Sequence, residues 1–567
     1  MSSEHSSSGI PLSRRHVLGI GAGVAGSALL GACSSGPAGS SSADSKLPLP
    51  DSLPAKKLPG THLSPLPGVA AAYEKLPVPG YVSVPKKPGS GGKVTAFTIT
   101  YGPPPMPLKD NVWHQAINKA LGVDLEPTIV PSENFGEKLV TTIASGQIPD
   151  LTTNEPSYRG RAARKFLPQG VFWDLRELIG GDKVKQYPNL ARVPDYAWKN
   201  SRIDGAIYGV PNFRNQEIGG TIGFRQDWAA KGGMPDKPKN LDELFAWLKA
   251  IKAGGGKNSY PLATIDQTFS FCGLQTYKAP NNWKLNKDGS LTKDLETDEY
   301  EKALVFANKL WKAGLVHPDV ITLTPNPAQY QGYFFSGRVG ITNTNIDGYF
   351  GTTGLFAQLL QQQPNAKADV LIPPGWNGGL GMIGPDLGFY GMLSIPTSVK
   401  DKGRVAELLR IIDFLAAPLG SKEYYLTHYG VEGHNYEFKN GVPVSSTDTK
   451  IQSENFLSFL ASFNSGFFFP NTKNDAMICQ GYAEQMSKAF VADPTASLDS
   501  PTSFSKGDAL AQTIQDYTQA IITGRKPVSA LSELRQRWKS GGGDQIRKEL
   551  EEAITAEKTA ETKTGHK

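Results

Sequence analysis

Residues 93–101 read KVTAFTITY, a run of β-branched and aromatic residues that predicts a buried strand. Apolar residues recur at helical spacing over 111–121, so we expect a helix there, followed by a second strand over 123–130. A second helix is expected over 135–143 and a third strand over 148–152. Strands that alternate with helices predict βαβ units and a mostly parallel sheet, which is an α/β fold.

The composition limits the kind of protein. With 567 residues the chain is longer than one hydrophobic core usually organises, so two or more lobes are expected. The net charge of +6 is spread without a dense Lys/Arg block, so no nucleic-acid partner is expected. Three cysteines exclude a disulfide-rich scaffold, and Cys272 and Cys479 either pair or stay as free thiols.

The N-terminus has the pattern of an export signal. Arg14 and Arg15 precede an apolar stretch that is shorter than the roughly 20 residues of a membrane-spanning helix. The paired arginines resemble a twin-arginine signal, and the sequence LGAC that ends at Cys33 resembles the lipobox of bacterial lipoproteins. We therefore interpret residues 1–33 as a twin-arginine-type lipoprotein signal peptide, and the resemblance implies lipidation of Cys33.

Residues 34–92 are rich in Ser, Pro, Gly and Lys and lack periodicity, which predicts a flexible tether. Helices are expected over 241–253, 298–313 and 404–416, where apolar residues again repeat at helical spacing. The end of the chain, residues 546–567, is predicted to be a charged helix or tail.

Six short segments carry a resemblance to a known family: LGV (121–123), IASGQIPD (143–150), DGAIYGVP (204–211), RQDW (225–228), FSGRVG (335–340) and GVEG (430–433). Each segment is weak alone, whereas their order and spacing after a lipobox are fairly specific. Together they resemble the bacterial extracellular solute-binding proteins of ABC importers, of the carbohydrate-binding, maltose-binding-protein type.

The resemblance implies a two-lobed periplasmic-binding-protein-like fold with a hinge and a ligand cleft between the lobes. Lobe one is expected at 93–208 and 388–435 and lobe two at 209–387, with C-terminal helices over 436–545 packing mainly on lobe two. The implied protein is a monomeric, lipid-anchored receptor on the extracellular face of the cell membrane. It binds a sugar or oligosaccharide and delivers it to the permease subunits of an ABC importer in the membrane.

Candidate ligand-binding residues follow from the rule that ligands of open α/β sheets lie beyond the carboxyl ends of strands. A sugar needs flat apolar faces for its C–H surfaces and polar side chains for its hydroxyl groups. The candidates are Tyr101, Asn154, Glu155, Asn212, Arg214, Asn343, Asn345, Asp347, Tyr349 and Trp376.

Two other functions stay open at this point. A secreted glycosidase or lyase would also bind a sugar polymer, and the same binding fold could take a non-sugar solute such as a peptide. The sequence contains no HExxH, GxSxG or P-loop motif, so we expect no catalytic residues and no enzyme. Residues 254–259 lack the carboxylates of the calcium loop found in many long members, so neither a metal nor a cofactor is expected.

Overall fold

The computed structural model describes residues 47–54, 56–66, 68–155, 161–217, 219–462 and 466–564. The predicted signal peptide, its lipidation site Cys33 and the first part of the predicted tether lie outside these residues. Among the helices described, none combines the length and the apolar character that crossing a membrane requires.

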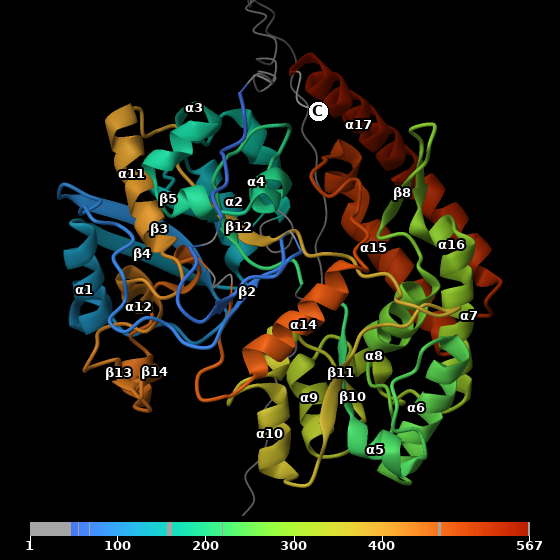
Figure 1. The fold of residues 1–567 in the computed structure, drawn as a ribbon. Helices are drawn as coiled ribbons and strands as arrows, with labels where there is room; N and C mark the ends of the chain where they lie inside the picture. Colours follow the sequence, from blue (N-terminus) through green and yellow to red (C-terminus); the bar gives the residue numbers. More distant parts are fainter. Residues whose placement is uncertain are drawn as a thin grey trace, which may run out of the picture. The chain divides into compact units, whose positions relative to one another are not determined.

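Lobe one is built on a five-stranded mixed sheet (Figure 1). Strand β3 is parallel to β4 and β5, whereas β12 runs antiparallel to both β5 and β6. The predicted βαβ start of the fold is therefore confirmed. The expectation of a mostly parallel sheet is wrong, because β12 pairs antiparallel with both of its neighbours and the sheet of lobe two is entirely antiparallel. The strands, in their order across the sheet, are β4 (Asp124–Pro131), β3 (Lys93–Thr100), β5 (Leu151–Asn154), β12 (Phe389–Ser394) and β6 (Val210–Phe213).

Side-chain alternation along β3 explains why the sheet lies between two cores. Val94 and Ala96 are buried in one cluster, while Phe97 and Ile99 are buried in another cluster. Both faces of the sheet are covered by helices, as an α/β sheet requires. The helices of lobe one are α1 (Val112–Leu121), α2 (Phe135–Ala144), α3 (Arg176–Ile179), α4 (Asp195–Asn200), α11 (Lys402–Leu415) and α12 (Lys422–His428).

Lobe two contains a smaller antiparallel sheet in the order β10 (Ile341–Thr342), β7 (Ile222–Arg225) and β11 (Ala368–Leu371). A separate hairpin is formed by β8 (Trp283–Leu285) and β9 (Leu291–Lys293). The helices of this lobe are α5 (Gln226–Lys231), α6 (Leu241–Gly255), α7 (Asp298–Lys312), α8 (Val320–Leu323), α9 (Pro327–Phe335), α10 (Leu355–Gln362) and α14 (Asp475–Ser487).

The last three helices, α15 (Pro501–Ile522), α16 (Ala530–Trp538) and α17 (Asp544–Thr564), share a hydrophobic core with α6 and α7. Ile546, Leu550 and Ile554 of α17 are buried in that core. The charged end of the chain is thus an amphipathic helix that packs on lobe two through these residues.

The prediction of a flexible tether over residues 34–92 is wrong for the part of this range that the structure describes. Strand β2 (Ala71–Tyr73) pairs with β1 (Thr61–His62) and with the distant β15 (Gly466–Phe467). Leu58 and Leu76 are buried in a cluster that includes residues of α12. The apolar stretches are too short to give a periodic signal, but partners far away in sequence cover them.

Two predicted lobe boundaries also need correction. Strand β6 belongs to the sheet of lobe one, so this lobe extends to Phe213 instead of ending at residue 208. Beyond residue 435, the hairpin of β13 (Tyr436–Lys439) and β14 (Val442–Ser445) begins with Tyr436, which packs in the same cluster as α12. After α13 (Thr449–Gln452), Phe456 and Ala461 enter a core of lobe one. The C-terminal part therefore packs on lobe two only from about α14 onward.

Both internal cysteines are free thiols and both are buried. Cys272 lies in the core shared with the C-terminal helices, whereas Cys479 lies on α14 in the second core of lobe two. The alternative of a disulfide between them is therefore excluded.

Candidate functional site

Two chain segments connect the lobes, 214–221 after β6 and 383–388 before β12. They run side by side, because the backbone N–H of Arg214 donates to the Gly388 carbonyl (2.9 Å) and that of Asp386 donates to the Gln216 carbonyl (3.0 Å). A paired connection of this kind is the expected form of a hinge between two lobes.

Three aromatic side chains meet beside this connection, and we call Tyr101, Tyr390 and Phe459 the aromatic cluster. The Tyr390 and Phe459 rings lie 4.4 Å apart, and the Tyr101 ring stands edge-on to Phe459 at 5.6 Å. The hydroxyl oxygens of Tyr101 and Tyr390 are 2.6 Å apart. Tyr101 is 50% exposed, although large apolar rings are usually covered. The cluster therefore offers an accessible aromatic surface.

A charged pair lies against the aromatic cluster. The guanidinium of Arg214 donates through Nε to Asp386 Oδ1 (3.0 Å) and through Nη2 to Asp386 Oδ2 (2.6 Å). Its carbon Cζ lies 5.9 Å from the centre of the Tyr390 ring. These two hydrogen bonds fix the guanidinium of Arg214 in one orientation, and its third nitrogen, Nη1, takes no part in the pair.

Three buried polar side chains at or near the connection, Asn154, Glu217 and Thr221, have atoms without a hydrogen-bond partner. Asn154, the last residue of β5, is 2% exposed, and neither its Oδ1 nor its Nδ2 is bonded. Glu217 is 1% exposed, and its Oε2 accepts no hydrogen bond. Burial raises the pKa of Glu217 to about 7, against an opposing hydrogen bond from its own backbone. Such unsatisfied groups are uncommon in folded proteins, and a ligand that bonds Asn154 and Glu217 would satisfy them.

Asp347 extends the site into lobe two. Burial raises the pKa of its carboxyl, while two backbone N–H groups and the Arg214 guanidinium act in the opposite direction. The residue nevertheless keeps exposed surface. The positive charge of Arg214, on the connecting segment, thus acts on a carboxyl group of lobe two.

Three other predicted residues serve the protein itself. Asn212 donates through Nδ2 to the Phe459 and Ala461 carbonyls, both at 3.0 Å, and so holds the segment that carries Phe459. Asn343 Oδ1 accepts from Gln267 at 2.8 Å. Tyr349 is fully buried in the core of lobe two, so the prediction that it contacts ligand is wrong. The sequence of the loop, in which Tyr349 follows Asp347 by two residues, does not indicate that the Tyr349 ring is buried.

The last three predicted residues lie at separate places. Glu155 follows Asn154 and is buried, while Asn345 is exposed in the loop before Asp347. Trp376 is 51% exposed, and its backbone is bonded to Thr276 and Leu241, away from the aromatic cluster.

Sequence reasoning missed Glu217, Asp386, Tyr390 and Phe459 as site residues. Tyr390 lies in the segment by which the chain is predicted to return to lobe one, so this position beside the expected hinge could have indicated a site residue. No local pattern singles out the other three, because their position depends on contacts between distant segments.

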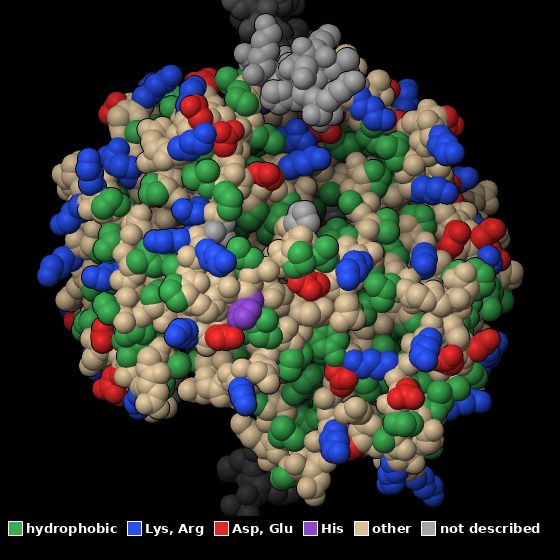
Figure 2. All heavy atoms as spheres, viewed as in Figure 1, with side chains coloured by type: hydrophobic (Ala, Val, Ile, Leu, Met, Phe, Trp, Pro, Cys, Tyr) green, Lys and Arg blue, Asp and Glu red, His purple; other side chains and the backbone are tan. Residues whose placement is uncertain are grey.

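Charged side chains of both signs are distributed over the face shown in Figure 2. Lys, Arg, Asp and Glu side chains are mixed over the visible face, without a large patch of one sign (Figure 2). Within the described ranges, no three His, Cys, Asp or Glu side chains gather as a metal site would require.

Comparisons with known proteins agree with this architecture. The family model described as bacterial extracellular solute-binding protein matches residues 113–429. The lipoprotein LipO of Bacillus subtilis is 26% identical over 464 residues, covering 78% of this chain and 89% of LipO. The polygalacturonan/rhamnogalacturonan-binding protein YtcQ of the same bacterium is 27% identical over 492 residues, covering 82% of this chain and 92% of YtcQ.

The fold is similar to that of an extracellular solute-binding protein from Bifidobacterium longum subsp. infantis. The TM-score is 0.61 at 18% identity, over 82% of this chain and 99% of that chain. Because the family model covers more than half of the chain, this protein belongs to the bacterial extracellular solute-binding proteins.

Proposed function

We propose that this protein is an extracellular receptor that binds an oligosaccharide beside its paired connection and presents it to an ABC import permease. The observation that carries the proposal is the accessible aromatic cluster with Arg214 against it, together with the unsatisfied polar atoms of Asn154 on β5 and Glu217 on the connecting segment. Aromatic rings pack on the C–H faces of a sugar, and amide, carboxyl and guanidinium groups bond its hydroxyls. The sugar-binding name of the relative YtcQ supports the same ligand class.

Binding is proposed to close the two lobes around the sugar, with the protein acting as a monomer. Arg164 of lobe one forms an ion pair with Asp499, which leads into α15, at 2.5 Å. Arg202 of lobe one approaches Glu557 of α17 at 3.8 Å. These pairs join lobe one to the helices that pack on lobe two, so they favour the conformation in which the lobes touch.

Replacing Arg164 with alanine is expected to raise the Kd for the sugar about tenfold, mainly through faster dissociation, because a mostly buried charge loses its partner. Both side chains are largely buried, at 12% and 15% exposure. Stopped-flow dissociation kinetics would measure the effect, with Arg525→Ala on the exposed surface as the control. Rescue of slow dissociation by the exchange Arg164→Asp with Asp499→Arg would support the pair, whereas unchanged kinetics in Arg164→Ala would contradict it.

The protein is also proposed to be anchored by lipid on the outer face of the membrane through Cys33. LipO, one of its relatives, is named a lipoprotein. Substitution Cys33→Ala is expected to abolish labelling by an alkyne fatty acid, which the wild-type protein should incorporate. Equal labelling of the variant would show that the lipid is attached elsewhere.

A ligand screen tests the function itself. The protein without residues 1–33 would be mixed with neutral oligosaccharides, with acidic oligosaccharides and with peptides, and its melting temperature would be recorded in each case. An increase with an oligosaccharide that is recovered intact supports the receptor. Cleaved sugar would identify an enzyme instead, and an increase with peptides alone would change the solute class.

A further inference from the structure

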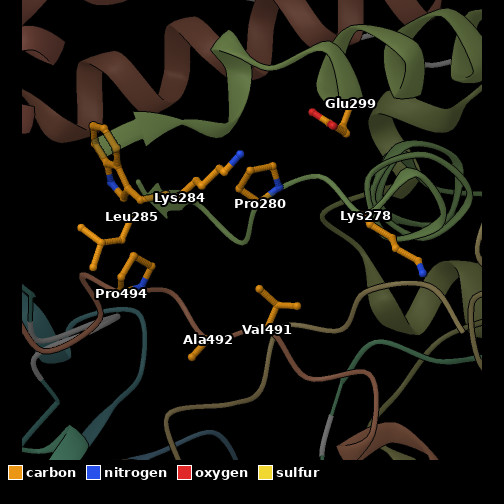
Figure 3. Close-up of a pocket in the computed structure, with 9 residues that line it drawn as sticks. Lys278, Pro280, Lys284, Leu285, Glu299, Val491, Ala492 and Pro494 are labelled. Atoms are coloured by element: carbon orange, nitrogen blue, oxygen red, sulfur yellow. The ribbon is translucent and has the colours of Figure 1, made fainter. Parts of the chain in front are cut away.

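A hollow lies on lobe two, outside the aromatic cluster. It is a cavity of about 390 Å³ between the loop that leads into β8 and the segment that follows α14 (Figure 3). This volume falls within the range of small-ligand sites. Its lining residues are Lys278, Pro280, Trp283, Lys284, Leu285, Glu299, Val491, Ala492 and Pro494.

The lining combines apolar surface with unpaired positive charge. Leu285 and Val491 remain 36% and 44% exposed, and Figure 3 places Val491 and Pro494 across the pocket from Pro280. Lys278 and Lys284 are exposed and make no ion pair with any residue that the structure describes, and with the carboxylate of Glu299 they give the lining a net charge of +1. A sugar ring that carries a carboxylate would use both features, since its C–H face packs on the apolar wall and its charge pairs with a lysine.

The two walls of the pocket are held together before any ligand arrives. Asn281 Nδ2 donates to the Val491 carbonyl (3.1 Å), and Asn282 Nδ2 donates to Asp493 Oδ2 (2.6 Å). Lys278 and Asn282 also have positive φ angles, 59° and 65°, which few residues other than glycine adopt. Strained backbone of this kind is kept where the surrounding structure imposes it, often at ligand sites.

The segment that carries Val491 is hydrogen-bonded to one of the two segments that connect the lobes. The Val491 N–H donates to the Ile383 carbonyl (2.9 Å), and the Ile383 side chain closely approaches Gly220 of the other crossing segment. A few residues further on, the same segment reaches Asp499, which pairs with Arg164 of lobe one. One wall of the pocket is therefore bonded directly to a segment that connects the lobes.

We propose that this pocket is a second subsite, which holds a uronic acid unit of the oligosaccharide through Lys278 and Lys284. The proposal rests on the proposed function, because it assigns a negatively charged sugar to the same receptor. It also assigns the ligand's chemical class, an acidic oligosaccharide several units long.

Calorimetry with hexagalacturonate and with the neutral maltohexaose tests the subsite. The variant Lys278→Ala/Lys284→Ala is expected to bind hexagalacturonate roughly tenfold to hundredfold more weakly, because two charge-assisted contacts are lost. The control Lys257→Ala/Lys287→Ala removes the same charge from exposed positions outside the pocket and is expected to change the Kd less than about twofold. The loss should shrink at high salt, because salt screens the lysine–carboxylate attraction.

Two outcomes would overturn the subsite, and a third would overturn the proposed function itself. An equal loss in both double variants would mean that only the overall charge matters and would overturn the subsite. Unchanged binding of hexagalacturonate by Lys278→Ala/Lys284→Ala would overturn it as well. If the wild-type protein bound neither sugar and the wider screen found no oligosaccharide, the proposed function itself would fail.

Discussion

Replacing Asn154 with valine is expected to stabilise the ligand-free protein and, at the same time, to weaken ligand binding. The amide is buried at the end of β5 without a partner on either atom, so it costs folding free energy until a ligand bonds it. Valine suits a strand and removes both unsatisfied atoms. We expect the free energy of unfolding to rise by about 1 kcal/mol and the Kd for the sugar to rise at least about tenfold.

Thermal unfolding and calorimetry on the same samples would measure both effects. Asn212→Val is the matched control, since it is also a buried asparagine in the same sheet but its amide donates to two carbonyls. That variant should lose stability. If Asn154→Val instead lowered the melting temperature and left the Kd unchanged, Asn154 would have a purely structural role.

The strand and helix pattern of lobe one could be predicted because it depends on local spacing. The run 93–101 contains β3, and the predicted helix over 111–121 corresponds to α1. In α1 the side chain of Asn111 accepts the His114 N–H, and Gly122 ends the helix at a φ of 75°. Each of these features lies within a few residues of the element that it defines.

The errors arise where distant segments meet. Strand β2 lies in the predicted tether, because its three apolar residues are too few to show the periodicity of a strand or helix. Its partner β15 lies almost 400 residues away in the sequence. The site shows the same limit. Asp386 pairs with Arg214 across the crossing, and Phe459 reaches Tyr390 from a segment assigned to lobe two. Tyr349 shows that a position in a promising loop does not decide which way a side chain points.

Ligand binding is expected to become tighter as the pH rises, and substitution Glu217→Gln is expected to remove this dependence. Burial raises the pKa of Glu217 from 4.5 to about 7, so in the free protein the carboxyl is mostly neutral below that pH. A sugar hydroxyl that donates to the unbonded Oε2 favours the charged form, so binding lowers the pKa and releases a proton. The affinity should therefore rise about tenfold between about pH 6 and pH 8.

The stability of the free protein should change in the opposite direction. A carboxyl with a raised pKa stabilises the fold below its unfolded value of 4.5, and this contribution is lost as the pH rises through about 7. The full loss is about 3 kcal/mol, which Glu217→Gln would avoid. The groups that face Glu217 from α4 and α14 are Tyr196 and Cys479, and both have raised pKa values, so they stay neutral in this range.

Calorimetry near pH 7 in two buffers of different ionisation enthalpy would count the protons released on binding. Asp413→Asn is the matched control, because burial also raises the pKa of Asp413 to about 7, but this carboxylate accepts the Asn189 and Leu190 N–H groups inside lobe one. The control should alter the pH dependence of stability and leave that of binding intact. Wild-type affinity that did not change with pH, or a Glu217→Gln variant that kept the dependence, would show that Glu217 is not the group that couples binding to pH.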